Sequence, residues 1–90
     1  MPKIHYLPKF NSVYCKFTKN NKRRVKSIDK VLEIFAANPK HPSLKLEKLS
    51  GREIWTIRID KGNRLFFVWS KNGDVAIFFF VGPHDSYKNI

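Results

Sequence analysis

Apolar side chains recur with two different periods along this chain, and the change of period predicts the order of its elements. Residues 9–18 carry apolar side chains three or four positions apart, which is the spacing of one face of an α-helix. Residues 22–37 repeat that spacing over a longer stretch, and its apolar stripe consists of Val25, Ile28, Val31, Leu32 and Phe35. Asn38 ends this second helix because the residue before a proline disfavours helical backbone angles.

Strand patterns flank the two helices. Residues 3–7 are typical of a short edge strand that ends at Pro8. Residues 53–60 alternate between apolar and polar, residues 65–69 form an apolar run that follows Arg64, and residues 75–81 form a second apolar run after a turn signal. We therefore expect a single α+β domain over residues 1–90, in the order β-α-α-β-β-β. Its helices are expected to pack on one face of a mostly antiparallel, four-stranded, twisted sheet.

Two turn signals set the predicted register of the last three strands. Residues 60–62 fit a three-residue hairpin loop with Gly62 in the left-handed conformation, and this loop pairs Arg58 with Arg64. A two-residue loop would instead place the arginines on opposite faces of the sheet. The Asn-Gly pair at residues 72–73 predicts the second hairpin, whose register pairs Arg64 with Val81.

The predicted registers sort the strand residues into two faces. One face carries Arg58, Arg64, Phe66, Val68, Ile77 and Phe79. The other carries Trp55, Ile57, Leu65, Phe67, Trp69, Phe78 and Phe80. We expect the second face to form the core under the helices, which leaves Arg58 and Arg64 side by side on an open face with His84 at its rim. Two like charges directly opposed on a sheet are unfavourable unless an anion shares them.

Charge changes the picture more than size does. The chain has 90 residues and a net charge of +11, and residues 1–50 hold 12 Lys and Arg against three Asp and Glu. Clustered positive charge is typical of proteins that bind nucleic acid or an acidic protein, although a lysine-rich solvated surface is an alternative. The single Cys15 excludes an intramolecular disulfide and is expected to be a small buried side chain. Neither a signal peptide nor a bilayer-length apolar run is present, which favours a cytoplasmic location without a membrane partner.

The side chains best able to bind an anion or transfer a proton lie at the end of the predicted sheet. Arg58 and Arg64 lie in or at the edge of strands, and His84, Asp85 and Tyr87 follow the last strand. This combination favours a site for a phosphate-bearing substrate.

Each of these side chains also has a structural alternative. Arg58 could form a surface ion pair with Asp60 or Glu53. Arg64 could be a charge at the end of a hairpin, and His84 could be an exposed loop residue. Asp85 could orient His84 or cap a terminal turn. The ring of Tyr87 could pack against the sheet instead of meeting a substrate.

Further basic side chains lie around these candidate site residues. They are either ordinary solvated surface residues or residues that steer a polyanion toward the site. Three lie near the sheet or in its first hairpin loop, namely Lys45, Lys48 and Lys61. Three lie off the apolar stripe of the second helix, namely Lys22, Arg23 and Lys26. The sequence has no cluster of carboxylates, so neither a metal site nor another cofactor is expected.

The motifs of the second half resemble those of a known family. They are KLSG at residues 48–51, IWTIRID at residues 54–60, NRLFFVW at residues 63–69 and the element His84-x-x-Tyr87. In their order after a strand and two helices, they resemble the RelE/ParE superfamily of type II toxins over nearly the whole chain. RelE-type members are small basic endoribonucleases that cut mRNA, usually in the ribosomal decoding site, and an antitoxin inhibits them.

The resemblance implies a role for each motif residue. Arg58 falls on the second-strand basic position, Arg64 on the third-strand arginine, His84 on the C-terminal His/Arg position and Tyr87 on the C-terminal aromatic. An RNA 2′-hydroxyl would attack its own phosphate while the arginines stabilise the developing charge. His84 would act as general acid or base, with Asp85 holding its tautomer. The implied partners are a cognate acidic antitoxin, mRNA and the ribosome.

The sequence departs from the family pattern at one position. Thr56 stands where some members carry a lysine, which bears on rate and target preference. ParE-type members share the fold but inhibit DNA gyrase, and they generally lack the C-terminal His/Tyr pair. His84 and Tyr87 therefore favour the ribonuclease branch, with a gyrase inhibitor and a non-catalytic RNA-binding module as the alternatives.

Overall fold

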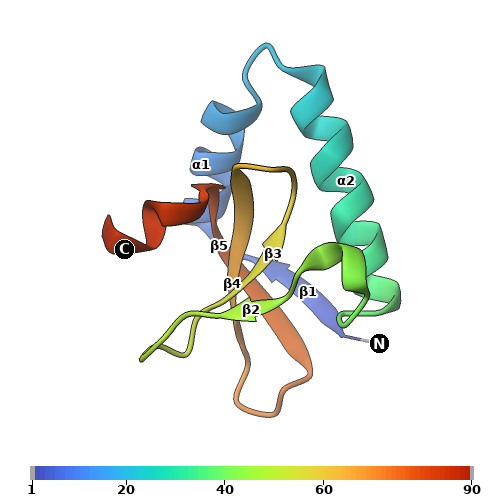
Figure 1. The fold of residues 1–90 in the computed structure, drawn as a ribbon, viewed down its shortest axis with the longest axis vertical. Helices are drawn as coiled ribbons and strands as arrows, with labels where there is room; N and C mark the ends of the chain where they lie inside the picture. The colour runs from blue at the N-terminus through green and yellow to red at the C-terminus, as the bar shows by residue number, and fades with distance from the viewer. Residues whose placement is uncertain (1, 90) are drawn as a thin grey trace.

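The computed structural model of the chain describes residues 2–89, and for residues 87–89 the backbone alone. Figure 1 shows the course of the chain. The helices are α1 (Pro8–Thr18) and α2 (Lys22–Ala37). The strands are β1 (Lys3–Tyr6), β2 (Glu47–Lys48), β3 (Trp55–Arg58), β4 (Asn63–Trp69) and β5 (Val75–Pro83). The short 3₁₀ turns are η1 (Pro42–Leu44) and η2 (His84–Asn89).

The strands form one sheet in the order β1-β5-β4-β3-β2. β1 lies at an edge and runs parallel to β5, whereas the other neighbouring strands are antiparallel. The predicted α+β class, the edge strand and the C-terminal meander are confirmed. The expectation of four strands is wrong by one, because the two-residue strand β2 pairs with β3 and is too short to produce a periodic pattern.

Local sequence signals explain where the helices begin and end. Pro8 lies in the first turn of α1, where its missing N–H removes no helical hydrogen bond. Asn21 caps α2, since its side chain accepts a hydrogen bond from the backbone N–H of Arg24 at 3.0 Å. α2 stops before Asn38, as the following proline predicts. In the described part of the chain, neither helix has the length and apolar character needed to cross a bilayer.

The core lies between the helices and the predicted face of the sheet. Phe35 of α2 is fully buried, and its ring centroid lies 5.1 Å from that of Phe67 and 5.6 Å from that of Phe78. These edge-on ring contacts lock α2 onto β4 and β5. Val25 of the predicted stripe lies outside this cluster, and Cys15 on α1 is exposed rather than buried.

A β-bulge interrupts the pairing of β4 and β5. Phe67 pairs with Phe78, but Phe66 pairs with Phe80, so β5 contains one extra residue, Phe79, at this point. The predicted face of Phe80 is therefore wrong. Phe80 lies opposite Phe66 on the face away from the helices, with ring centroids 5.6 Å apart. Alternation cannot reveal a bulge because it assumes an unbroken ladder.

The bulge also changes the residue that faces the second arginine. Arg64 pairs with Gly82, not with Val81 as the sequence predicts. Gly82 leaves room for its neighbour, since a Cβ atom there would lie 3.0 Å from the ring of Phe80. Arg64 thus faces a position without a side chain, two residues before His84.

The face that carries the arginines is packed and not merely solvated. Thr56 and Phe66 are both 0% exposed, although they alternate along their strands with the helix-side core residues Ile57 and Leu65. The arginine side chains therefore project from a rigid surface.

Candidate active site

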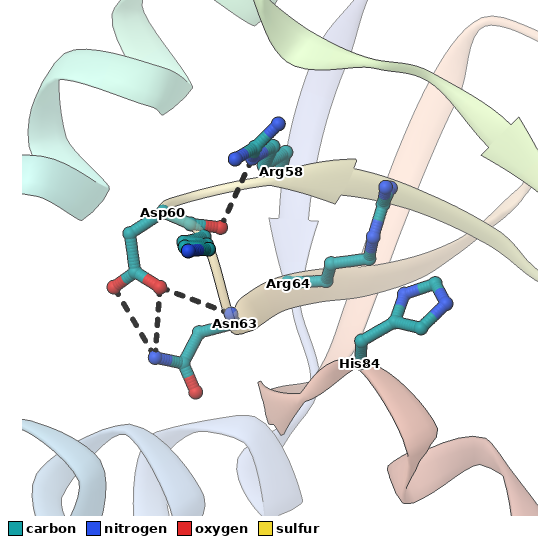
Figure 2. A pocket seen from close by; sticks show the side chains of 6 residues that line it. Arg58, Asp60, Asn63, Arg64 and His84 are labelled. Carbon is teal, nitrogen blue, oxygen red and sulfur yellow. Dashed lines mark hydrogen bonds between the residues drawn. The ribbon is translucent and has the colours of Figure 1, made fainter.

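Arg58 and Arg64 face each other across β3 and β4, which confirms the predicted pairing. A hollow of about 250 Å³ lies here, lined by Arg58, Asp60, Lys61, Asn63, Arg64 and His84. Figure 2 shows the two arginines on neighbouring strands, with the imidazole ring of His84 beside Arg64. We call this hollow the arginine pocket.

The carboxylate of Asp60 shapes the loop between β3 and β4. It accepts hydrogen bonds from the backbone N–H of Gly62 at 2.9 Å, from that of Asn63 at 3.0 Å and from the Asn63 side-chain amide at 3.0 Å. Because the Asp60 carboxylate accepts hydrogen bonds from the backbone N–H groups of the loop in this Asx-type turn, the loop does not need a left-handed glycine. The expectation for Gly62 is wrong, and the described glycines with positive φ are Gly51 and Gly73.

Arg58 is oriented by the backbone of the same loop. Its Nε donates a hydrogen bond to the carbonyl oxygen of Asp60 at 3.2 Å. The alternative surface ion pair does not form, because the Asp60 carboxylate bonds within the loop and Glu53 pairs with Lys48 at 3.3 Å. Nη1 and Nη2 of Arg58 have no hydrogen-bond partner among the residues that the structure describes. These two nitrogens can therefore donate to an anion.

Arg64 is held from its other side. Its Nη1 donates to the Thr56 hydroxyl at 2.9 Å and to the carbonyl oxygen of Lys45 at 3.1 Å. Both acceptors are fixed, since Thr56 is completely buried and Lys45 is held in the left-handed conformation (φ 49°) directly after η1. Within the described part of the chain, Nε and Nη2 of Arg64 have no partner. Arg64 therefore also presents N–H donors in a fixed orientation.

His84 reaches the arginine pocket because β5 continues into η2 beside the β3–β4 loop. Its backbone N–H donates to the carbonyl oxygen of Gly62 at 3.0 Å, which ties the start of η2 to the loop. The His84 side chain is exposed and lines the pocket. Asp85 is exposed but does not line it. The side chain of Tyr87 lies outside the described residues, so its role stays a prediction.

The arginine pocket is basic. Its cations are Arg58, Lys61 and Arg64, whereas the carboxylate of Asp60 is already occupied by the loop. Among the described residues, no group of three or more His, Cys, Asp and Glu side chains is placed to hold a metal ion. Such a pocket favours an anionic group, and the planar guanidinium forks suit a phosphate.

The remaining predicted basic residues lie in different settings. Lys48 forms an ion pair with Glu53, as noted above, at the edge strand β2. On α2, Arg23 lines a second hollow beside the β3–β4 loop. Lys22 and Lys26 are exposed but line neither this second hollow nor the arginine pocket. The structure thus separates three basic residues that the helical pattern groups together.

Two contributions to the site carry no clear signal in the sequence. In the sequence, Thr56 is only a departure from the family pattern, whereas in the structure its hydroxyl accepts a hydrogen bond from Arg64 and orients that side chain. Glu47 lines a neighbouring hollow of about 260 Å³ together with His84. Because β2 is only two residues long, no alternation distinguishes Glu47 from an ordinary surface glutamate.

Solved structures show what the fold resembles, whereas no protein-family model and no curated protein sequence matches the chain. A YoeB/ParE toxin from Agrobacterium tumefaciens superposes with a TM-score of 0.75 at 20% identity, over 91% of this chain and 98% of its own. YafQ from E. coli strain BL21(DE3) gives 0.71 at 12% identity, over 97% and 98%. The heterotetrameric YoeB–YefM toxin–antitoxin complex from Staphylococcus aureus gives 0.70 at 24% identity, over 93% and 98%. The chain has the RelE-like toxin fold.

The RelE-like fold confirms the resemblance that the sequence motifs indicate. At identities of 12–24% the likeness establishes the fold and not the chemistry. The roles of Arg58, Arg64 and His84 therefore rest on the geometry of the arginine pocket.

Proposed function

We propose that this RelE-like protein is the toxin of a type II toxin–antitoxin system and acts as a metal-independent endoribonuclease. Its substrate is mRNA, presented by the ribosome. The observation that carries the proposal is the pairing of Arg58 with Arg64 beside His84, with guanidinium nitrogens on both arginines that bond to no other described residue. The motif resemblance and the fold support the same assignment.

The two arginines supply charge stabilisation. In the proposed reaction an RNA 2′-oxygen forms a bond to the adjacent phosphorus, and the bond from phosphorus to the 5′-oxygen breaks. The products are a 2′,3′-cyclic phosphate and a free 5′-hydroxyl. Negative charge builds on the non-bridging oxygens at the pentacoordinate stage, and the preoriented N–H groups of Arg58 and Arg64 stabilise it.

The reaction also moves two protons. The 2′-hydroxyl loses one and the leaving 5′-oxygen gains one, so a single imidazole cannot serve both ends at once. His84 lines both the arginine pocket and the hollow that Glu47 lines. We assign the carboxylate of Glu47 as the proton acceptor and His84 as the donor. Asp85 and Tyr87 keep their predicted roles, in orienting His84 and in stacking on a base.

The basic residues around the pocket act in two ways: some are placed to contact the RNA phosphate directly, and others only add to the positive electrostatic potential. Lys61 lines the pocket and is placed to contact a phosphate. Lys45 contributes its backbone carbonyl to Arg64, and its charge, like that of Lys48, adds to phosphate steering. Lys22 and Lys26 contribute only to the general positive field.

Thr56→Val is expected to lower the cleavage rate about tenfold, because Arg64 loses one of two acceptors that orient its guanidinium group. Valine keeps the β-branched shape on the strand, so the fold should persist with an unfolding free energy lower by about 1 kcal/mol. Single-turnover cleavage and thermal unfolding measure the two effects. Thr56→Ser retains the hydroxyl and is the control. An unchanged rate in Thr56→Val would show that the hydroxyl does not position Arg64.

The proposed function is tested by following RNA ends. We expect purified protein, with ribosomes present, to produce fragments that carry 5′-hydroxyl and 2′,3′-cyclic phosphate ends. A substrate with a 2′-deoxy sugar at the cleaved position should stay intact, because it lacks the nucleophile. Expression in cells should create new mRNA 5′ ends and stop translation. Intact RNA in all these assays would contradict the proposal.

An acidic antitoxin is the expected partner. A domain with a net charge of +11 binds RNA non-specifically unless an acidic segment covers its basic face. We expect that segment to fold onto α2 or the open face of the sheet, over the arginine pocket. Co-expression of the protein encoded beside this chain should relieve growth arrest, and the two should co-purify. Failure of both results would count against the antitoxin.

A further inference from the structure

A second hollow lies on the far side of the β3–β4 loop from the arginine pocket. It measures about 310 Å³, and it lies between Arg23, Arg24 and Ser27 of α2 and the loop residues Asp60, Lys61 and Asn63. The same three loop residues line the arginine pocket. The loop therefore forms a wall of both hollows. Figure 1 shows the β3–β4 hairpin pointing toward the connection between α1 and α2, where Arg23 and Arg24 begin the second helix.

The walls of this hollow are basic and partly rigid. Arg24 is fixed, since its Nη1 donates to the carbonyl oxygen of Phe17 at 2.9 Å and its guanidinium lies 4.1 Å from the Phe17 ring centroid. The guanidinium of Arg23 is exposed and has no partner in the described chain. The acidic side chain in the wall, Asp60, is occupied by the loop. Arg23 and Lys61 are thus the cations that remain open to a ligand.

A third hollow joins the same route. It measures about 330 Å³ and is lined in part by Ser27, Lys30 and Arg58. Arg23, Ser27 and Lys30 are spaced i, i+4 and i+7, so they share one face of α2. This face looks toward the loop and toward Arg58, whereas Lys26 does not line any of the three hollows.

We propose that the RNA strand continues from the arginine pocket past the β3–β4 loop, and that a phosphate next to the cleaved one binds between Arg23 and Lys61. This inference rests on the proposed ribonuclease function. A nucleic acid fits better than an acidic peptide because the hollow shares its loop wall with the arginine pocket, where the proposed function places a phosphate. A strand that places one phosphate between Arg58 and Arg64 must extend over the adjoining surface, and this surface is lined with cations.

The test compares two probes on single-residue variants. The probes are fluorescently labelled 2′-O-methyl RNAs, which bind without being cleaved: a dinucleotide with one phosphate and a longer single strand. Arg23→Ala is expected to weaken binding of the longer strand several-fold and to lower the slope of log affinity against log salt by about 0.7, the value for one phosphate contact on a single strand. Binding of the dinucleotide should not change. Fluorescence anisotropy over a salt series measures both quantities.

Lys26→Ala is the matched control, because it removes the same charge from the same helix. This control tests whether the overall positive potential alone explains the loss of RNA binding, since a long-range electrostatic effect should be similar at positions 23 and 26. Equal salt slopes in Arg23→Ala and Lys26→Ala would overturn the inference. Unchanged RNA binding by Arg23→Ala, with weaker binding of a glutamate-rich peptide, would assign the hollow to an acidic protein and also overturn it.

Failure of the proposed function has a different signature. Arg58→Ala should weaken both probes, since both place a phosphate in the arginine pocket. If Arg58→Ala changes neither, or if the wild-type protein binds no RNA, the pocket is not a phosphate site and the inference falls with it. If Arg58→Ala behaves as expected and Arg23→Ala matches Lys26→Ala, the function stands and the route past the loop is wrong. Circular dichroism of each variant confirms that α2 is retained.

Discussion

Arg64→Ala is expected to lower RNA cleavage by about 100-fold or more, because one preoriented donor to a developing oxyanion is typically worth that factor. Arg64 meets this description through the two hydrogen bonds of its Nη1, to Thr56 and to Lys45, which aim the rest of the guanidinium group at the pocket. The measurement is the single-turnover cleavage rate on a defined mRNA with ribosomes present.

Two further variants separate chemistry from folding. Arg64→Lys keeps the charge but loses the planar fork, so its rate should fall between those of alanine and wild type. Lys71→Ala removes an exposed charge from the turn between β4 and β5 and should leave the rate unchanged. Thermal unfolding should show that all three variants fold, since Arg64 is only half-buried. A folded Arg64→Ala protein with full toxicity would contradict the assignment.

His84→Ala is expected to reduce the cleavage rate by about 10²–10⁴-fold, because it removes a group that transfers a proton in the reaction. The fold should persist, since the side chain is exposed and the link from η2 to the loop runs through the backbone N–H of residue 84. Growth arrest should disappear with the activity. Glu47→Gln should also slow cleavage, because it removes the carboxylate that accepts the proton of the 2′-hydroxyl, whereas Glu53→Gln, on the ion pair with Lys48, should not.

The same variant distinguishes the ribonuclease from a gyrase inhibitor of the same fold. A ribonuclease should cause loss of translation and new mRNA ends, without DNA breaks. Tyr87→Ala should weaken its activity by about 1–3 kcal/mol if the ring stacks on a base. Inhibition of gyrase supercoiling that survives both His84→Ala and Tyr87→Ala, with no cleavage of mRNA, would favour the gyrase-directed alternative.

Much of the fold could be read from the period of the apolar residues. Both helices, the edge strand and the meander follow from local patterns, because each element needs one apolar face to join the core. β2 and the bulge at Phe79 could not be read in this way. A two-residue strand has no period, and a bulge breaks the period where it occurs.

The candidate site was predictable in part. The pairing of Arg58 with Arg64 followed from the loop length, even though the reason given for the loop, a left-handed Gly62, is wrong. The grouping of Arg58, Arg64 and His84 followed as well. The partners that orient the arginines were not predictable, because Lys45 acts through its backbone carbonyl and Asp60 through its own carbonyl oxygen.

By itself, the sequence determined the order of the elements apart from β2, the core face of β3 and β4, the excess of positive charge and the grouping of Arg58, Arg64 and His84. These properties depend on neighbours along the chain or on a hairpin of known length. Only the tertiary structure decided that Glu47 shares a hollow with His84, that Thr56 anchors Arg64, and that Arg23 rather than Lys26 borders the loop. The reason is physical: the two hollows join segments distant in the sequence, and their geometry exists only once α2, β2 and η2 have packed around the sheet. The hydrogen bond from Arg64 to Thr56 lies within one hairpin, but it depends on the side-chain conformation of Arg64, which alternation along a strand does not specify.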